Sequence, residues 1–279
     1  MLEQTLELLR RNRIRLLKQA GQHQVVDGAL LERMVNYAGL SPEDVVLEIG
    51  AGIGNLTSLI ARRAKKVIAV ERDRRFARVL RERVGHYKNV DIIIGDILKL
   101  RLPPFEKVVA NLPYGISSEV TFKLMEQDFK MAVLMYQREF AERLIAKPGS
   151  DGYGRLTVMV YYRASVELLE EVDPSAFFPQ PKVFSALVRL RPRRPPFKIL
   201  DEGVFSDVVR ALFQHRRQKV RNALYHSFHE VFTDLNLRKS ERKQLIEKIL
   251  PQDLLNQKVI ELTPERIGEI ANYLSEINP

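Results

Sequence analysis

The tetrapeptide Asn111-Leu112-Pro113-Tyr114 combines residue types that suit a reaction at an amine conjugated to an aromatic ring. Such a nitrogen has a delocalised lone pair, so an enzyme must accept its hydrogens to draw it toward tetrahedral geometry. The Asn111 side-chain carbonyl and the Leu112 main-chain carbonyl can accept them. Pro113 has no N–H to compete, and the Tyr114 ring can stack on a base. Taken alone, the tetrapeptide is equally consistent with an ordinary proline turn beside a packed tyrosine.

A glycine-rich turn, Glu48-Ile49-Gly50-Ala51-Gly52-Ile53-Gly54-Asn55, precedes this tetrapeptide. Gly50 and Gly52 lie where an expected strand ends and a helix begins, which lets the backbone approach a ligand. A dinucleotide-binding fingerprint, G-x-G-x-x-G, would need glycine where this chain has Asn55. The spacing therefore disfavours a nicotinamide-dependent oxidoreductase.

Two carboxylates follow the next two expected strands. Glu71, 21 residues after Gly50, can accept both ribose hydroxyls of an adenosine group, and Asp96 can accept from the exocyclic amine of adenine. Asp96 alone would as readily be a helix cap or a solvated loop carboxylate. Because all strand carboxyl ends of an open α/β sheet face one crevice, we expect both acids to meet Gly50 and Asn111 there. Together they favour a methyl donor containing adenosine, with in-line displacement at a sulfonium methyl group.

The elements that must position these residues are buried parallel strands alternating with helices. Short apolar runs at 45–50, 67–71, 90–94, 107–111 and 131–136 are typical of such strands. Helical spacing of apolar residues is found between or after them, at 55–63, 73–85, 117–127 and 137–146. The predicted fold class is therefore α/β, built from repeated βα units.

The remainder of the chain predicts a sheet edge and a helical tail. Runs 156–164 and 185–191 are expected to form an antiparallel pair of strands, and the Pro/Arg segment 191–196 marks a domain boundary. Helices are expected at 203–213, 216–228, 239–249 and 264–275, the last capped by Thr263 with Pro264 at its first position. We predict a catalytic domain at 1–194 and a small all-helical domain at 195–279.

Composition limits the chemistry and the partner. The 279 residues include no cysteine, which excludes thiolate metal sites and cysteine nucleophiles, and the predicted chemistry needs no metal. The net charge of +10 favours a polyanionic partner, either nucleic acid or a membrane surface. Since no apolar run approaches the ~18 residues of a membrane span and no signal-peptide block is present, we expect an intracellular, cytoplasmic protein.

Three basic clusters are candidates for contact with that polyanion, and any one of them alone is more often a solvated face. They are Arg10, Arg11, Arg13, Arg15 and Lys18; residues 189–198; and Arg216, Arg217, Lys219 and Arg221. In the third, arginines fall where the apolar stripe of a helix should continue. Either that helix breaks at His215 or its guanidinium groups face phosphates. No cluster has the long apolar face that a membrane contact needs.

The sequence resembles the KsgA-type ribosomal RNA adenine dimethyltransferases. The similarity runs in order from about residue 13 to 224, and it is most specific in the NLPY and PKVxSA elements. The matching segments are GQHQVVD (21–27), EIGAGIGNLT (48–57), VIAVERD (67–73), GDIL (95–98), NLPYGISS (111–118), YGRLTVMVYY (153–162), FFPQPKVFSALVRL (177–190) and HRRQKVRNAL (215–224). The resemblance implies a seven-stranded Rossmann-like domain that binds S-adenosylmethionine, followed by a helical domain.

The resemblance also implies roles for particular residues. Cofactor-binding positions are expected at His23, Val25, Gly50, Gly52, Glu71, Asp96 and Asn111. The catalytic motif is expected at Asn111–Tyr114, and Phe177 is expected to stack on a target base flipped out of its helix. This chain has Gln24-Val25 where the family usually has Phe-Leu, so main-chain contacts of that segment are retained while side-chain contacts can differ.

The implied reaction is N6,N6-dimethylation of two adjacent adenosines in the loop of the 3′-terminal helix of small-subunit rRNA. The expected substrate is that rRNA or a pre-assembled small subunit, and the expected enzyme is a monomer without an obligate protein partner. Two alternatives remain open. One is a large-subunit rRNA adenine methyltransferase of the macrolide-resistance type, and the other is a non-catalytic RNA-binding assembly factor.

Overall fold

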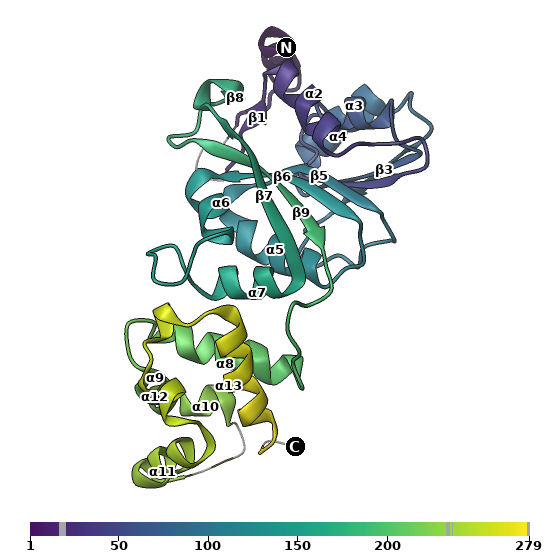
Figure 1. Ribbon diagram of the computed structural model, residues 1–279. Helices are drawn as coiled ribbons and strands as arrows, with labels where there is room; N and C mark the ends of the chain where they lie inside the picture. The colour runs from purple at the N-terminus through teal and green to yellow at the C-terminus, as the bar shows by residue number, and fades with distance from the viewer. Residues whose placement is uncertain (17–20, 233–234, 236, 278–279) are drawn as a thin grey trace. The chain divides into compact units, whose positions relative to one another are not determined.

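The computed structural model describes residues 1–16, 21–232, 235 and 237–277 (Figure 1). These residues divide into two compact units, the first formed by Met1–Ala141 and Ser165–Pro192 and the second by Glu142–Ala164 and Arg193–Pro279. The chain passes between the units three times, whereas the predicted domains are separated by one boundary after residue 194. Residues 142–164 thus belong by their contacts to the helical unit.

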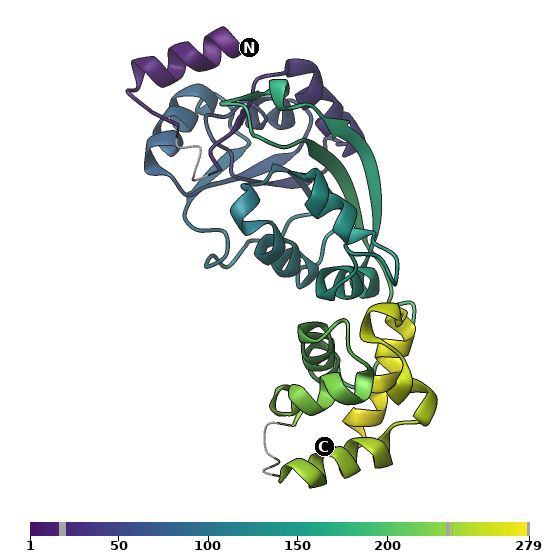
Figure 2. The same cartoon turned by 90° about the vertical axis from the view of Figure 1, so that its left-hand side faces the viewer.

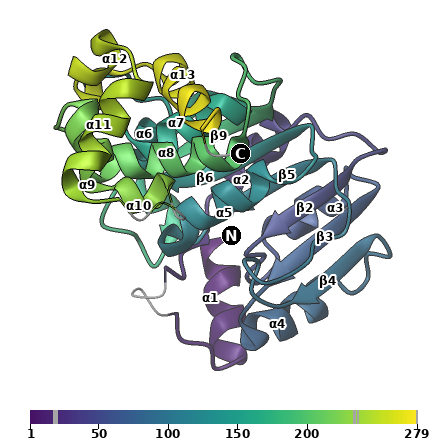
Figure 3. The same cartoon turned by 90° about the horizontal axis from the view of Figure 1, so that it is seen from below.

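In the described part of the first unit, seven strands form one sheet in the order β4-β3-β2-β5-β6-β9-β7. All neighbouring pairs among strands β2 to β6 are parallel, whereas β9 is antiparallel to β6. The succession from β4 through β3 and β2 to β5 is visible in Figure 3. The strands are β2 (Val45–Ile49), β3 (Lys66–Glu71), β4 (Val90–Ile94), β5 (Lys107–Asn111), β6 (Met131–Gln137), β7 (Ala164–Val172) and β9 (Ser185–Pro192). The predicted α/β class and seven-stranded sheet are confirmed.

The strand register brings the polar strand ends to one edge of the sheet. Ile49 at the end of β2 pairs with Val70, and Glu71 at the end of β3 pairs with Ile94 at the end of β4. Asn111 ends β5 opposite Met135 of β6. The five apolar runs predicted as parallel strands are confirmed as β2 to β6. Buried interior residues explain the nearly continuous apolar pattern of β2, β3, β5 and β6, whereas the residues of the edge strand β4 are only partly buried or exposed.

Helices and a small second sheet complete this unit. The helices are α1 (Leu2–Arg11), α2 (Gly28–Tyr37), α3 (Thr57–Ala61), α4 (Arg74–Val84), α5 (Ser117–Met125) and the first part of α6 (Arg138–Leu144), whose residues from Glu142 on belong to the second unit. Strands β1 (Gln24–Val25) and β8 (Phe177–Phe178) pair with each other in antiparallel fashion, with Val25 opposite Phe177. Asp27 and Asp73 cap α2 and α4 by accepting from main-chain N–H groups of their first turns.

The prediction of a strand at 156–164 is wrong. Residues Arg155–Arg163 form helix α7, and the strand that follows it, β7, is the neighbour of β9 in the sheet. Val158 and Tyr162, four residues apart and so on one face of the helix, are buried in the core of the second unit. The valines and tyrosines of this segment favour a strand locally, but packing of that apolar face overrides the preference. The strand expected at 185–191 is confirmed as β9.

The second unit is helical around its own core (Figure 2). Besides α7 it contains α8 (Glu202–Gln214), α9 (Val220–His226), α10 (Phe228–Val231), α11 (Lys239–Ile249), α12 (Gln252–Asn256) and α13 (Pro264–Ser275). Thr263 caps α13 by accepting from the N–H of Arg266, as expected. The helix expected at 216–228 begins only at Val220. In the part of the chain that the structure describes, no helix combines the length and apolar character needed to cross a membrane.

Candidate active site

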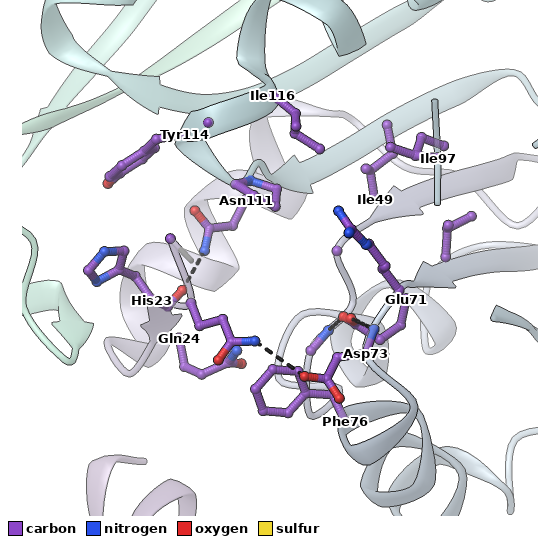
Figure 4. A pocket seen from close by; sticks show the side chains of 18 of the residues that line it. His23, Gln24, Ile49, Glu71, Asp73, Phe76, Ile97, Asn111, Tyr114 and Ile116 are labelled. Carbon is purple, nitrogen blue, oxygen red and sulfur yellow. Dashed lines mark hydrogen bonds between the residues drawn. The ribbon is translucent and has the colours of Figure 1, made fainter. Parts of the chain in front are cut away.

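A cavity of about 950 Å³ lies where β2, β3, β4 and β5 end. Its lining includes eight of the residues singled out by sequence: His23, Gly50, Gly52, Glu71, Asp96, Asn111, Pro113 and Tyr114. Figure 4 shows His23, Asn111 and Tyr114 on one side and Glu71, Asp73 and Ile97 on another. The expected convergence of the strand ends is therefore what the structure shows.

The glycine turn requires glycine for two physical reasons. Gly50 and Gly52 have φ angles of 74° and 58°, in the left-handed region that L side chains rarely adopt. A Cβ atom on Gly52 would also lie 2.6 Å from Oε1 of Gln24. The Gly52 N–H donates to Oε2 of Glu71 at 2.8 Å, so the turn is bonded to the carboxylate at the end of the neighbouring strand.

Glu71 is buried, with 7% of its surface exposed. Its carboxylate accepts from the Gly52 N–H and, through Oε1, from the Asp73 N–H at 2.7 Å. Burial raises the pKa of Glu71 above the usual carboxyl range, and these main-chain hydrogen bonds partly oppose that rise. A fixed carboxylate facing a cavity is suited to accept hydroxyl groups of a bound sugar.

Asp96 lies just beyond β4 and is more exposed than Glu71, with 26% of its side chain accessible. Its Oδ1 accepts from the Leu98 N–H at 3.1 Å, and its Oδ2 lies 3.8 Å from Nη1 of Arg72. Asp96 thus acts as a loop carboxylate that accepts from its own main chain, as one of the two alternatives expected. This role is combined with a position in the cavity wall, between Gly95 and the buried Ile97.

The orientation of the Asn111 amide is set by the N-terminal segment. Its Nδ2 donates to the main-chain carbonyl of His23 at 3.0 Å. Because a carbonyl can only accept, the amide nitrogen must face His23 and the amide oxygen must point away from it, within the cavity (Figure 4). The His23 ring is held in turn by Nδ1, 2.6 Å from the Pro179 carbonyl oxygen.

Tyr114 is half-buried beside Asn111 and is held at both its ring and its hydroxyl. The ring stacks on that of His23 with centroids 5.7 Å apart, and the hydroxyl lies 2.6 Å from Oγ of the fully buried Ser185. Burial raises the pKa of Tyr114, so the phenol stays neutral near pH 7. Leu112, between these residues, buries its side chain in the core and so anchors the peptide whose carbonyl was predicted to act.

Three of the predicted catalytic and cofactor-binding residues do not line the cavity: Val25, Leu112 and Phe177. Val25 is buried, and its carbonyl accepts from Nδ2 of Asn55 at 2.9 Å. Phe177 is 2% exposed in the core of the first unit, so the structure does not place it where a target base could stack on it. Its pairing with Val25 turns both side chains into the same core, and Phe178 packs on a separate cluster near α1 and α4.

Several lining residues were missed by sequence reasoning, among them Gln22, Gln24, Arg72, Gln137, Lys182 and Val183. Gln137 ends β6, beside the strand that Asn111 ends, so the rule about carboxyl strand ends could have found it. Lys182 and Val183 follow the rigid Pro-x-Pro turn. No local signal marks Gln22 and Gln24, which reach the cavity through the folding of the N-terminal segment.

Comparison with known proteins is decisive. The model of a protein family described as "Ribosomal RNA adenine dimethylase" matches residues 13–262. The chain belongs to this family. It is 47% identical over 256 residues to the "Probable ribosomal RNA small subunit methyltransferase A" of Methanosarcina acetivorans, covering 92% of this chain and 93% of that protein. The protein of the same name from Methanothermobacter thermautotrophicus is 45% identical, with 99% and 97% covered.

Solved structures agree with this assignment. A dimethyladenosine transferase from Plasmodium falciparum superposes with a TM-score of 0.75 at 31% identity, covering 90% of this chain and 96% of that one. The 23S rRNA methyltransferase ErmE gives a TM-score of 0.65 at 29% identity, covering 90% and 99%.

The cofactor of this adenine dimethylase family, S-adenosylmethionine, fits the residues present. Gly50 and Gly52 have no side chain that would extend into the space for the cofactor. Glu71 provides carboxylate oxygens at the end of β3. Ile49 and Ile97 supply apolar surface between the polar groups. An adenosine group needs this combination of acceptors for its hydroxyls and amine with apolar contact for its ring.

Of the two alternatives for the third basic cluster, the structure shows the helix break. Helix α8 ends at Gln214, so the apolar stripe stops because the helix breaks at His215. Arg216 donates through Nη1 to the Asp151 carbonyl at 2.7 Å and therefore ties together parts of its own unit. Arg221 bonds Oδ1 of Asn256. Arg217 and Lys219 are exposed. In the first cluster, Lys18 lies outside the described residues.

Proposed function

We propose that this protein transfers methyl groups from S-adenosylmethionine to N6 of two adjacent adenosines in the loop of the 3′-terminal helix of small-subunit rRNA. The names of its relatives from Methanosarcina acetivorans and Methanothermobacter thermautotrophicus support the small subunit as the source of the substrate. The observation that carries the chemistry is the Asn111 amide, whose nitrogen is held by the His23 carbonyl so that its oxygen is free to accept inside the cavity.

Asn111 and Leu112 act on the substrate amine as hydrogen-bond acceptors. In the first transfer the Asn111 oxygen and the Leu112 main-chain carbonyl each accept one N6 hydrogen, and in the second transfer one of them accepts the single hydrogen that N6 still has. The nitrogen lone pair is thereby withdrawn from the ring and made available for attack. Since Pro113 has no N–H, this pair of acceptors faces no competing donor from the same peptide. These neutral groups act without being ionised, and the extra proton leaves after the new N–C bond has formed.

Tyr114 and the cofactor residues position the two reactants. The Tyr114 ring, held by Ser185 and His23, is suited to stack on an adenine flipped out of its helix. Glu71 and Asp96 would hold the ribose hydroxyls and the adenine amine of S-adenosylmethionine, with Gly50 and Gly52 allowing close approach of the backbone. When bound there, S-adenosylmethionine supplies an electrophilic methyl group on sulfur.

The substrate is either small-subunit rRNA or a partly assembled small subunit. The charge of +10 supports a polyanionic substrate, and phosphate contacts from exposed residues such as Arg217 and Lys219 would position it. We place this activity in the cytoplasm and expect the enzyme to act as a monomer. Gel filtration with light scattering tests the oligomeric state.

Mass-spectrometric mapping tests the proposed reaction. Unmodified small-subunit rRNA and small subunits are each incubated with the protein and S-adenosylmethionine, and the 3′ end is digested and analysed for N6,N6-dimethyladenosine. We expect dimethylation of both adjacent adenosines and none in large-subunit rRNA treated in parallel. Because a 23S rRNA methyltransferase has a similar structure, modification confined to large-subunit rRNA would overturn the choice of substrate.

A further inference from the structure

An exposed aromatic side chain, Phe184, lies beside the cavity wall. It is 39% exposed, and the preceding residue, Val183, is 45% exposed. Val183 and Lys182 both line the cavity, and Phe184, which is not part of the lining itself, is the next residue of the chain. A large apolar ring left in water next to a functional cavity indicates a surface that a partner covers.

The main chain holds Phe184 firmly in this position. Its carbonyl accepts from the Arg138 N–H at 2.9 Å, directly after Gln137, another lining residue. On its other side, Ser185 is fully buried and meets the Tyr114 hydroxyl at 2.6 Å. Phe184 therefore directly precedes Ser185, the first residue of β9, whose hydroxyl holds Tyr114.

A cation accompanies the ring. The Arg138 guanidinium lies 5.5 Å from the Phe184 ring centroid and also pairs with Glu171 through Nη1 at 2.9 Å. The Glu171 carboxylate orients this guanidinium, and Lys182 adds a second exposed positive charge at the rim. An aromatic face among cations is the combination with which proteins bind single-stranded nucleic acid, because bases stack on the ring while phosphates approach the charges.

We propose that Phe184 is a stacking platform for a nucleotide next to the reacting adenosine. This rests on the proposed function, which brings an RNA loop to the cavity. The reacting base must reach Asn111 inside the cavity, whereas Phe184 lies outside at the rim, so the base that it meets belongs to a neighbouring nucleotide. Stacking tolerates any base, and it holds the strand without reading its sequence. Phe177, buried in the core, cannot take this part.

Binding measurements with an RNA loop fragment test the platform. The fragment carries 2-aminopurine directly next to the reacting pair, on its 5′ side in one version and on its 3′ side in another. We expect the wild-type protein to quench this fluorophore in one version. Phe184→Ala should abolish that quenching and weaken RNA binding about tenfold, whereas Phe184→Trp should retain both. Affinity for S-adenosylmethionine, measured by calorimetry, should be unchanged.

A matched control and an altered RNA separate stacking from other effects. Leu168 is also 39% exposed, but neither of its neighbours in the chain lines the cavity, whereas Phe184 directly follows the lining residue Val183. Leu168→Ala should therefore bind RNA as the wild type does. An abasic nucleotide at the quenched position should weaken wild-type binding as much as Phe184→Ala does, and should add little in that variant. Equal affinity of Phe184→Ala and wild type for intact RNA would overturn the platform. Failure of the wild type to methylate both small-subunit rRNA and small subunits, while these binding effects hold, would instead overturn the proposed function.

Discussion

The side-chain nitrogen of Asn111 donates to the main-chain carbonyl of His23, although the two residues are 88 positions apart in the chain. This bond makes the N-terminal segment part of the catalytic geometry, because it decides which end of the amide faces the substrate. The side chain of His23 contributes separately, through its stacking on Tyr114.

Asn111→Ala removes the acceptor together with the hydrogen bond to the His23 carbonyl. We expect kcat to fall about 10²-fold to 10³-fold, the loss typical when one preorganised hydrogen-bonding group is deleted from an active site. Gel-shift titration should show nearly unchanged affinity for RNA. An Asn111→Ala enzyme with full activity would refute the role given to this residue.

Ser185→Ala and Tyr114→Phe each delete one partner of the 2.6 Å hydrogen bond that holds the Tyr114 ring. Each single change should lower kcat/KM several-fold, on the order of the ~1 kcal/mol of an ordinary hydrogen bond. Because both remove the same bond, the double variant should be scarcely worse than either single one. Fully additive losses would show that the two hydroxyls act independently.

Gly52→Ala places a Cβ atom at a φ angle of 58° and against the Gln24 side chain. The left-handed backbone should cost about 1–2 kcal/mol of unfolding free energy, and affinity for S-adenosylmethionine should fall as the turn shifts. Gly115→Ala is the matched control, since Gly115 also lines the cavity but a Cβ there meets nothing within 4 Å. Urea unfolding and calorimetry of both variants check this, and equal effects would contradict it.

Glu48→Gln tests a buried acid behind the glycine turn. Burial, with a contribution from the nearby Glu71 carboxylate, raises the pKa of Glu48 to about 8. Between the ordinary carboxyl pKa and that value, the unfolded chain releases the Glu48 proton while the folded chain keeps it, so stability falls as pH rises and levels off above pH 8. The Gln variant lacks this loss. Relative to wild type it should gain about 3–4 kcal/mol of unfolding free energy between pH 5 and pH 8. Parallel pH profiles would contradict the raised pKa.

The strand ends of the site could be predicted because each depends on local pattern and one topological rule. Apolar runs located β2, β3, β4 and β5, and parallel strands present their carboxyl ends at one edge, which brought Gly50, Glu71, Asp96 and Asn111 together. Helix α7 could not be predicted in this way. Its valines and tyrosines locally favour a strand, and the helix is stabilised instead by packing against the separate core of the second unit.

The aromatic residues show where sequence reasoning ends. Phe177 and Phe184 both flank the Pro-x-Pro turn, and nothing in their local sequence says which one is buried. The pairing of Phe177 with Val25, distant in the chain, turns that ring into the core. The hydrogen bond between Asn111 and the His23 carbonyl likewise depends on long-range folding. Its acceptor is a main-chain group, which every residue type has, so the sequence cannot identify it.

The basic residues at 216–219 offer a comparison between a structural arginine and residues exposed to solvent. Arg216 donates to the carbonyls of Asp151 and Tyr153, whereas Arg217 and Lys219 are exposed. Binding that is dominated by phosphate contacts weakens linearly when log K is plotted against log salt concentration. We expect the double variant Arg217→Ala/Lys219→Ala to reduce the magnitude of that slope by about two, at unchanged thermal stability.

Arg216→Ala should do the reverse, because it leaves two carbonyls without their donor. It should lower unfolding free energy by about 1–2 kcal/mol and leave the salt slope nearly as in wild type. Fluorescence anisotropy of a labelled small-subunit rRNA fragment at several salt concentrations gives the slopes, and urea unfolding gives the stabilities. If the double variant kept the wild-type slope, the RNA-facing role of Arg217 and Lys219 would be excluded, and the excess positive charge would have to act elsewhere.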